Sequence, residues 1–512
     1  MTNDADLAKK GFLDRLFSLI ERVGNLIPSP FILFLYLIAA LMIFTALMAY
    51  LDVVVTNPSN GELVKVKNLL SIEGIQWMFP NIVRNFASFT PLGSILALVL
   101  GAGLAERTGL LHALMMKMAQ GISKRFASYA VLFIAFFSHL SSDAAFVVMP
   151  PLGALMFIAV GRHPVAGLMA AIAGVASGFT ANILIVTTDV LLSGISTEAA
   201  KAINPELGVS VIDNWFFMSV SVCLLTVVGA LITDKFVEPR LGKWDGVGAP
   251  VGEEVLEKLS PEQNRALRLT GLAALVFIAL CALLVVPEGA ILRDPKLGTV
   301  MPSPFIKSIV PIIILFFFAT SITYGVATGK IKKQNDIPAL MVEPMKSMAT
   351  FIVMVFPLAQ FVAFFNWSNS GKFIAIAITN LLEHLGMTGV PAFVGLMFLS
   401  SFLCMFIASG SAIWSILAPI FVPMFMLLGY HPAFAQIVFR VSDSAVIPLA
   451  PMSPFLPMFL IFLQRYIKNA QLGTYYSLVL PYPIVFYIVW LALLIGWYLL
   501  GLPIGPGIYP KL

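Results

Sequence analysis

The sequence is poor in charged residues. Asp, Glu, Lys and Arg make up only 11% of the 512 residues, whereas 59% are hydrophobic. A soluble protein of this length needs far more polar surface to cover its core, so the composition excludes a soluble fold. Stretches of about 20 apolar residues have the length of membrane-spanning helices. The composition therefore predicts an all-α polytopic protein in a lipid bilayer.

Cysteine is scarce too, with three residues in the chain. Cys223, Cys281 and Cys404 all lie in apolar segments and lack the paired spacing of a disulfide framework or a metal site. The G-x-S-x-G and H-E-x-x-H motifs of hydrolases are also absent. We therefore expect no catalytic residue, no metal and no other cofactor.

The formal net charge of +5 comes from basic residues in short loops between apolar stretches. In a membrane protein such residues set the orientation of the helices, so they do not indicate a nucleic-acid partner. Residues 1–30 form a charged, amphipathic lead-in without the cleavage site of a signal peptide. Placing the basic clusters on the inner side of the membrane puts the N-terminus in the cytoplasm.

Hydrophobicity predicts nine membrane spans. They are residues 31–50, 89–106, 164–194, 211–236, 266–287, 305–329, 346–366, 432–462 and 475–501. Two further apolar regions, 127–160 and 390–428, are too long for one span and contain small polar residues in the middle. The basic clusters all fall on one side only if each region enters and leaves the membrane on the same side. We predict re-entrant hairpins, the first opening to the cytoplasm and the second to the outside.

The polar stretch 237–265 is a cytoplasmic linker between two halves, 31–236 and 266–512. Its end, Ser260-Pro261-Glu262-Gln263, is a helix N-cap with a capping box. The halves share short motifs in the same order, "PSPF" before a span and "GRHP" or "GYHP" after a hairpin. Since the hairpins open to opposite sides, the repeat is inverted. An inverted repeat with interrupted membrane segments is typical of secondary transporters.

Polar residues at membrane depth are the candidates for function, because a charge there costs about 2.5–3.5 kcal/mol unless it is paired or faces water or substrate. They fall into groups at the hairpin tips and in two long spans. The candidates are Ser142, Asp143, Asn182, Asp189, Ser409, Gly410, Ser411, Trp414, Arg440 and Asp443, with Pro451 in a proline-rich helix break. Arg440 and Asp443 are one helical turn apart and can pair.

One stretch, "SHLSSDAAFVVMPP" from Ser138, combines the three residue types of a hydrolase triad. His139 and Asp143 are four positions apart on one local segment, whereas a triad draws its members from separate elements. We interpret the stretch as the turn of the first hairpin. Asp189 could instead be a helix-end residue at the outer interface, and Trp414 a packing aromatic.

These motifs together resemble the AbgT family of p-aminobenzoyl-glutamate transporters over nearly the whole chain. The resemblance is densest in "SHLSSDAAFVVMPP", "GFTANILIVTTDVLLSG", "FIASGSAIWSILAPIF" and "SDSAVIPLAPMSP". It implies a homodimer in the bacterial inner membrane, with nine spans and two hairpins in each subunit. It also implies a substrate path near the hairpin tips, with functional positions at Asp189, Ser411, Trp414, Arg440, Asp443 and Pro451. Some members hold sodium with an Asn near Cys404, and a thiol is a poor ligand for that cation.

We therefore expect a secondary active transporter of p-aminobenzoyl-glutamate, driven by protons rather than sodium. In this hypothesis Arg440 binds a substrate carboxylate and Trp414 stacks on the aminobenzoyl ring. Asp189, Asp443 and Asp143 are the candidate groups for the coupling cation. The alternatives are export of sulfonamide-like antimetabolites by the same fold, an ion channel and an intramembrane hydrolase.

Overall fold

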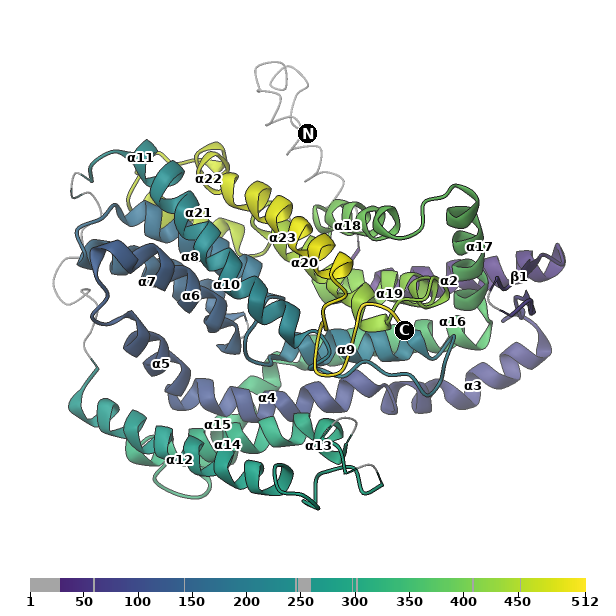
Figure 1. Cartoon of the computed structure of the whole chain (residues 1–512), viewed down its shortest axis with the longest axis horizontal. Helices are drawn as coiled ribbons and strands as arrows, with labels where there is room; N and C mark the ends of the chain where they lie inside the picture. The colour runs from purple at the N-terminus through teal and green to yellow at the C-terminus, as the bar shows by residue number, and fades with distance from the viewer. Residues whose placement is uncertain are drawn as a thin grey trace.

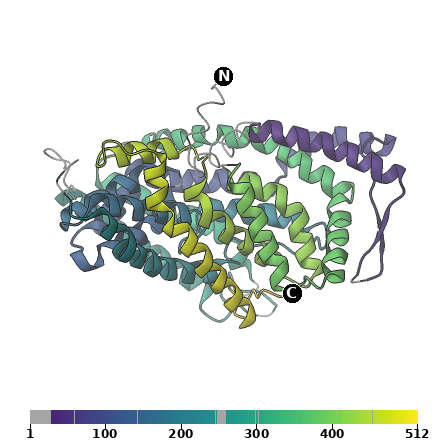
Figure 2. The same cartoon turned by 90° about the horizontal axis from the view of Figure 1, so that it is seen from above.

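The computed structural model describes residues 28–512, except 59, 142, 245, 247–258, 297, 301, 302, 408 and 452. The lead-in and most of the predicted linker lie outside the described residues. Eight helical segments in the described part are long and apolar enough to cross a membrane. The protein is therefore an all-α polytopic membrane protein. One two-stranded sheet, β1 (Val54–Thr56) paired antiparallel with β2 (Leu63–Lys65), projects at one end (Figure 2).

The first half contains long helices and one hairpin (Figure 1). Its helices are α2 (Pro30–Tyr50), α3 (Ile72–Ala87), α4 (Thr90–Thr108), α5 (Leu110–Ala119), α6 (Ala127–Phe137), α7 (Ala144–Ala159), α8 (Pro164–Gly178), α9 (Thr187–Ala200), α10 (Trp215–Ile232) and α11 (Glu238–Leu241). A π-helical stretch, Thr233–Val237, joins α10 to α11. Short 3₁₀ turns at Lys124–Phe126 and Ser138–Ser141 precede and follow α6.

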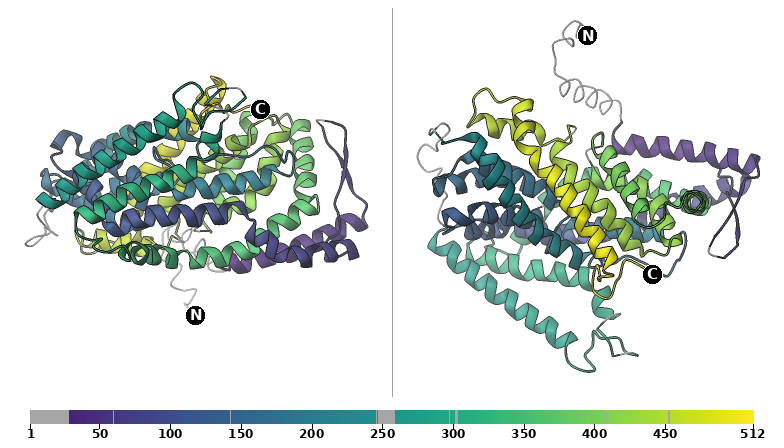
Figure 3. Two further views of the ribbon diagram at one scale, coloured as in Figure 1. Left: turned by 90° about the horizontal axis from the view of Figure 1, so that it is seen from below. Right: turned by 45° about the horizontal axis from the view of Figure 1, so that its top comes forward.

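The second half also consists of helices and one hairpin. Its helices are α12 (Pro261–Val285), α13 (Pro304–Lys307), α14 (Ile309–Ala327), α15 (Asp336–Ser347), α16 (Ala349–Trp367), α17 (Ser370–His384), α18 (Val390–Cys404), α19 (Gly410–Leu427), α20 (Pro432–Val446), α21 (Leu456–Gln464), α22 (Leu472–Val479) and α23 (Pro481–Leu499). The predicted capping box is present: the Ser260 hydroxyl accepts from the Gln263 amide, and the Gln263 side chain accepts from the Ser260 amide. Helices α12, α14 and α4 run alongside one another (Figure 3).

Both predicted hairpins are present. Helices α6 and α7 form the first and lie on the left of Figure 1, whereas α18 and α19 form the second and lie on the right. Two predicted spans are each two α-helices with an interruption between them. The interruption in the first was not predicted, whereas the proline-rich helix break in the second was. Span 164–194 is α8 and α9, and span 432–462 is α20 and α21. Each of the other predicted spans overlaps one long apolar segment, but the segment that contains 89–106 runs from Ile72 to Thr108 and includes α3, which was not predicted.

The repeat is visible in how the two broken helices begin. His163 and His431 each cap a helix, with ring Nδ1 accepting the backbone N–H two residues later at 3.2 Å. The His163 amide donates to Glu238, beyond the C-terminal end of α10. The His431 amide donates to Pro510, in the C-terminal segment whose Ile504 carbonyl accepts from Phe216 at the start of α10. The two helices thus start from opposite ends of α10, as an inverted repeat requires.

Helices α8 and α20 form the centre of the core. Every residue of α8 is buried, and so are the α20 residues from Pro432 to Ala445. Close packing of hairpin 1 on α8 depends on small residues, as is common between membrane helices. A side chain on Gly167 would meet the Gly153 carbonyl at 2.2 Å, so only glycine fits there. The centre of the molecule therefore presents the two helix breaks to the two hairpin tips.

Candidate functional site

A cavity of about 290 Å³ lies where the two hairpin tips meet the two helix breaks. Its walls come from the tip of hairpin 1, the end of α8, the tip of hairpin 2, α20 and the break after α20. The lining residues are Asp143, Phe146, Phe179, Cys404, Ile407, Ser409, Gly410, Ser411, Asp443, Ile447, Ala450, Ser453, Pro454 and Phe455. The structure thus brings together five predicted site residues: Asp143, Ser409, Gly410, Ser411 and Asp443.

Asp443 is the buried carboxylate of this cavity, with 2% of the residue exposed. Its Oδ1 accepts a hydrogen bond from the Cys404 thiol, with Sγ 2.9 Å away. None of the described residues donates to Oδ2. Oδ2 lies over Gly410, where a Cβ would approach it to 2.6 Å.

The tip of hairpin 2 is ordered by local hydrogen bonds. Ser409 is the N-cap of α19 and accepts from the Ala412 amide at 3.3 Å. The Ser409 and Ser411 hydroxyls are 3.1 Å apart, and both residues line the cavity. At the tip of hairpin 1, Asp143 is exposed and Ser142 lies outside the described residues. Pro451 is half-buried in the break before α21, next to the lining residue Ala450.

Arg440 does not pair with Asp443, and this part of the prediction was wrong. Its guanidinium is 2.5 Å from Asp189 Oδ1, and the two side chains are only 1% and 7% exposed. Arg440 also donates to the Thr180 carbonyl from Nε at 3.0 Å and from Nη2 at 2.5 Å. That carbonyl lies in the break after α8. The guanidinium therefore satisfies a backbone acceptor that the break leaves without a helical partner.

Asp189 lies in the first turn of α9 and is thus a helix-end residue, but it is buried in the protein with 5% exposed. Its Oδ2 accepts from the Val186 amide at 2.8 Å, which caps the helix. Its Oδ1 accepts from Arg440. Asp189 thus has partners on both oxygens, whereas Asp443 has a described hydrogen-bond partner on Oδ1 alone. The two carboxylates therefore have different hydrogen-bonding environments.

Trp414 is fully buried and does not line the Asp443 cavity. Its ring stacks on Phe439 at 4.7 Å between centroids, and its Nε1 donates to the Ser196 hydroxyl at 3.0 Å. Ser196 donates to Gln436 at 2.7 Å, and Gln436 donates to Asn214 at 2.8 Å. Asn214 in turn accepts from Arg440 at 3.5 Å.

A continuous chain of buried hydrogen bonds therefore connects hairpin 2 to the ion pair. The sequence analysis missed three of its members, Ser196, Asn214 and Gln436. Gln436 could have been found, because it lies one turn before Arg440 on the same buried helix face. The other two come from distant segments.

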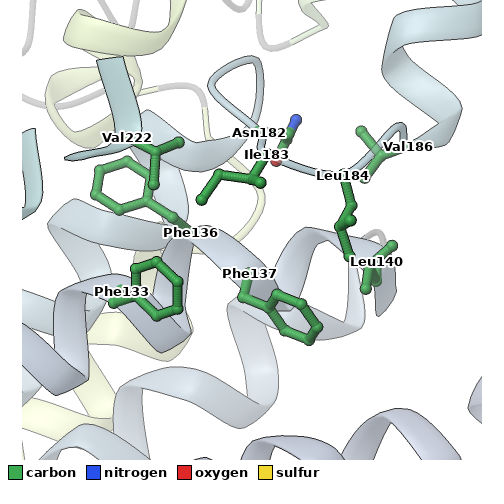
Figure 4. Close-up of a pocket in the computed structure, with 9 residues that line it drawn as sticks. All are labelled: Phe133, Phe136, Phe137, Leu140, Asn182, Ile183, Leu184, Val186 and Val222. Carbon is green, nitrogen blue, oxygen red and sulfur yellow. The ribbon is translucent and has the colours of Figure 1, made fainter. Parts of the chain in front are cut away.

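Asn182 lies in the break after α8, between two small spaces of about 10 Å³ each, roughly the size of one water molecule. One is lined by Asp189, Asn214 and Arg440 among others. The other is apolar apart from Asn182, with phenylalanines of α6 below the break (Figure 4). The space beside Arg440 thus has room for about one water molecule, whereas the cavity beside Asp443 has a volume of about 290 Å³.

Comparison with known proteins gives the family. The model of the "AbgT putative transporter family" matches residues 15–512. The chain belongs to the AbgT family. It is 67% identical to the p-aminobenzoyl-glutamate transport protein of Escherichia coli strain K12 over 498 residues, which cover 97% of each chain.

Two solved AbgT structures share the fold. The YdaH transporter of Alcanivorax borkumensis, described as having an unusual topology, is 36% identical, with a TM-score of 0.88 over 94% of this chain and all of that one. MtrF of Neisseria gonorrhoeae, described within a class of antimetabolite efflux pumps, is 37% identical, with a TM-score of 0.91 over 96% of this chain and all of that one.

Membership of the AbgT family confirms the predicted transporter and rejects the hydrolase alternative. The residues of the triad-like stretch fit this conclusion. His139 contacts the Val175 carbonyl of α8 through Nε2 and packs edge-on against Phe146 and Phe179. Its ring therefore holds the tip of hairpin 1 to α8, and it is not positioned as a catalytic base.

Proposed function

We propose that this chain is a secondary active transporter of p-aminobenzoyl-glutamate in the bacterial inner membrane, with its N-terminus in the cytoplasm. The observation that carries the proposal is the cavity between the two hairpin tips and the two helix breaks. In an inverted-repeat fold a substrate site at this position is reached alternately from either side. The substrate is proposed from the 67% identity to the Escherichia coli p-aminobenzoyl-glutamate transport protein.

The Arg440–Asp189 pair is the proposed coupling element. An arginine is suited to bind a substrate carboxylate with two parallel hydrogen bonds, but here Asp189 and Thr180 occupy its donors. Protonation of Asp189 removes the charge that holds Arg440, and the guanidinium becomes available to the glutamate end of the substrate. Binding of the proton and binding of the substrate then favour each other.

Asp443 and Asp143 remain further candidates for the coupling cation. Cys404 donates to Asp443, and a thiol is a poor ligand for sodium, so we propose proton coupling. The stacking role of Trp414 stays a prediction, since Phe439 covers one face of its ring here. The homodimer also stays a prediction, which the mass of the purified protein–detergent particle tests.

Substrate counterflow tests the proposed function without assuming a coupling ion. Proteoliposomes loaded with unlabelled p-aminobenzoyl-glutamate are diluted into labelled substrate with no ion gradient. A carrier accumulates label transiently above the outside concentration, whereas a channel only equilibrates it. Absence of accumulation, with a control transporter active in the same lipid, contradicts the proposal.

Efflux of antimetabolites is the second candidate function. The likeness to MtrF, described within a class of antimetabolite efflux pumps, favours it. Competition distinguishes the two: an exporter of sulfonamides is inhibited by sulfonamides in the counterflow assay at concentrations similar to those of the substrate. A transporter restricted to p-aminobenzoyl-glutamate is not.

A further inference from the structure

The Asp443 cavity has a chemistry that suits only one end of the proposed substrate. Among the described residues that line it there is no Lys, Arg or His, and two carboxylates, Asp143 and Asp443, are present. A dicarboxylate placed here would meet like charge without a compensating cation. The glutamate end of p-aminobenzoyl-glutamate therefore does not belong in this cavity.

A hydrogen-bond donor to Asp443 Oδ2, in contrast, is missing among the described residues, although the hydroxyls of Ser409, Ser411 and Ser453 belong to residues that line the cavity. Asp443 Oδ2 is buried and receives no hydrogen bond from the described residues, while Oδ1 is occupied by Cys404. A buried acceptor without a donor is unfavourable, and a ligand that supplies the donor recovers that free energy on binding. Gly410, which also lines the cavity, leaves space beside Oδ2, because a Cβ at this position would lie 2.6 Å from that oxygen.

Aromatic side chains supply the matching walls. Phe146 at the tip of hairpin 1 and Phe455 in the break after α20 stack with 4.4 Å between centroids and an angle of 4°. Phe179 at the end of α8 is tilted against Phe146, with centroids 6.5 Å apart. Flat rings bind well against such surfaces. The cavity therefore combines flat aromatic walls with one hydrogen-bond acceptor, the carboxylate of Asp443.

We propose that the Asp443 cavity is the arylamine subsite of the transporter: the ring of the substrate lies among Phe146, Phe179 and Phe455, and its amino group donates to Asp443 Oδ2. This assignment rests on the proposed function and gives the substrate an orientation, with the glutamate end directed away from Asp443. Asp443 is thereby a specificity-determining residue, which selects substrates that carry a neutral N–H donor on the ring.

The test compares ligands on the purified wild-type protein. Binding is measured for p-aminobenzoyl-glutamate, for benzoyl-glutamate, which lacks the amine, and for p-dimethylaminobenzoyl-glutamate, which keeps the nitrogen without an N–H. We expect the first to bind at least tenfold more tightly than the other two, because they leave Oδ2 without a donor. Equal binding of all three overturns the subsite but leaves the proposed function intact. Binding of none of them contradicts the proposed function itself.

A variant links the preference to Asp443. In Asp443→Asn the acceptor is no longer charged. We expect the dissociation constant of benzoyl-glutamate divided by that of p-aminobenzoyl-glutamate to fall close to one. In Asp52→Asn, an exposed aspartate outside the cavity, the ratio is expected to stay unchanged. The proposal is overturned if the preference for p-aminobenzoyl-glutamate over benzoyl-glutamate persists in Asp443→Asn. It is also overturned if this preference is observed only in the presence of sodium, because Oδ2 would then bind a cation. If Asp443→Asn does not fold, the wild-type comparison with the dimethylamino ligand decides.

Discussion

Arg440 pairs with Asp189, 251 positions away in the sequence, and leaves Asp443, on the next turn of its own helix, with a carboxylate oxygen that none of the described residues contacts by a hydrogen bond. The two buried acidic residues, one on α9 and the other on α20, thus have separate roles. One holds the arginine and caps α9, and the other faces the cavity. Both are buried in the core, but only Asp443 lines the cavity between the hairpin tips.

Breaking the buried pair is predicted to cost stability. Arg440→Gln or Asp189→Asn leaves one buried charge without its partner, which costs about 3–5 kcal/mol in comparable sites. The double variant carries no unpaired charge and is expected to recover much of the loss, yet to remain inactive in transport. Thermal unfolding of the purified proteins measures the effect.

The control for this prediction is the pair Lys346–Glu343, whose side chains are 66% and 53% exposed. Exposed ion pairs contribute little, so Lys346→Ala is expected to leave the unfolding temperature unchanged. If the double variant at Arg440 and Asp189 is as unstable as the single ones, the two residues do not act as a pair.

Gly410 is predicted to be intolerant of any side chain. In Gly410→Ala the new Cβ would lie 2.6 Å from Asp443 Oδ2, so either the carboxylate or the hairpin tip must move. We expect transport to fall at least tenfold while the protein still folds, because the change is confined to the cavity. Gly395→Ala on α18 is the matched control, since nothing lies within 4 Å of its Cβ position. Equal activity of both variants would show that the site around Asp443 accommodates the added methyl group.

Prediction from sequence succeeded where local signals decide the structure. Length and hydrophobicity located most of the apolar segments but not α3, small polar residues marked both hairpin tips, and Ser260 with Gln263 identified the start of α12. The break after α8 was missed as a break, because "GFTANILIV" contains no proline. The Asp189–Arg440 pair was missed because sequence spacing favours Asp443, whereas the rotation of α20 within the core turns Arg440 towards α9.

His431 is predicted to make stability depend on pH. Burial lowers its pKa to about 4, below the value of about 6.5 expected in the unfolded chain. Between these values the unfolded state binds more protons, so the contribution is fully present above about pH 6.5 and is lost as the pH falls towards 4. At pH 4.5 the loss amounts to about 2–3 kcal/mol.

The substitution His431→Asn keeps a side-chain acceptor for the N-cap and removes the titrating ring. We expect its unfolding temperature to change less between pH 7 and pH 4.5 than that of the wild type. An identical change in both proteins would mean that His431 does not titrate in this range.

The measurement that tests the account most directly is accumulation of labelled p-aminobenzoyl-glutamate in proteoliposomes under separately imposed proton and sodium gradients. The account predicts accumulation above the outside concentration with an inward proton gradient, no accumulation with a sodium gradient alone, and loss of proton-driven accumulation in Asp189→Asn. Accumulation driven by sodium alone, or proton-driven accumulation that survives in Asp189→Asn, would contradict it.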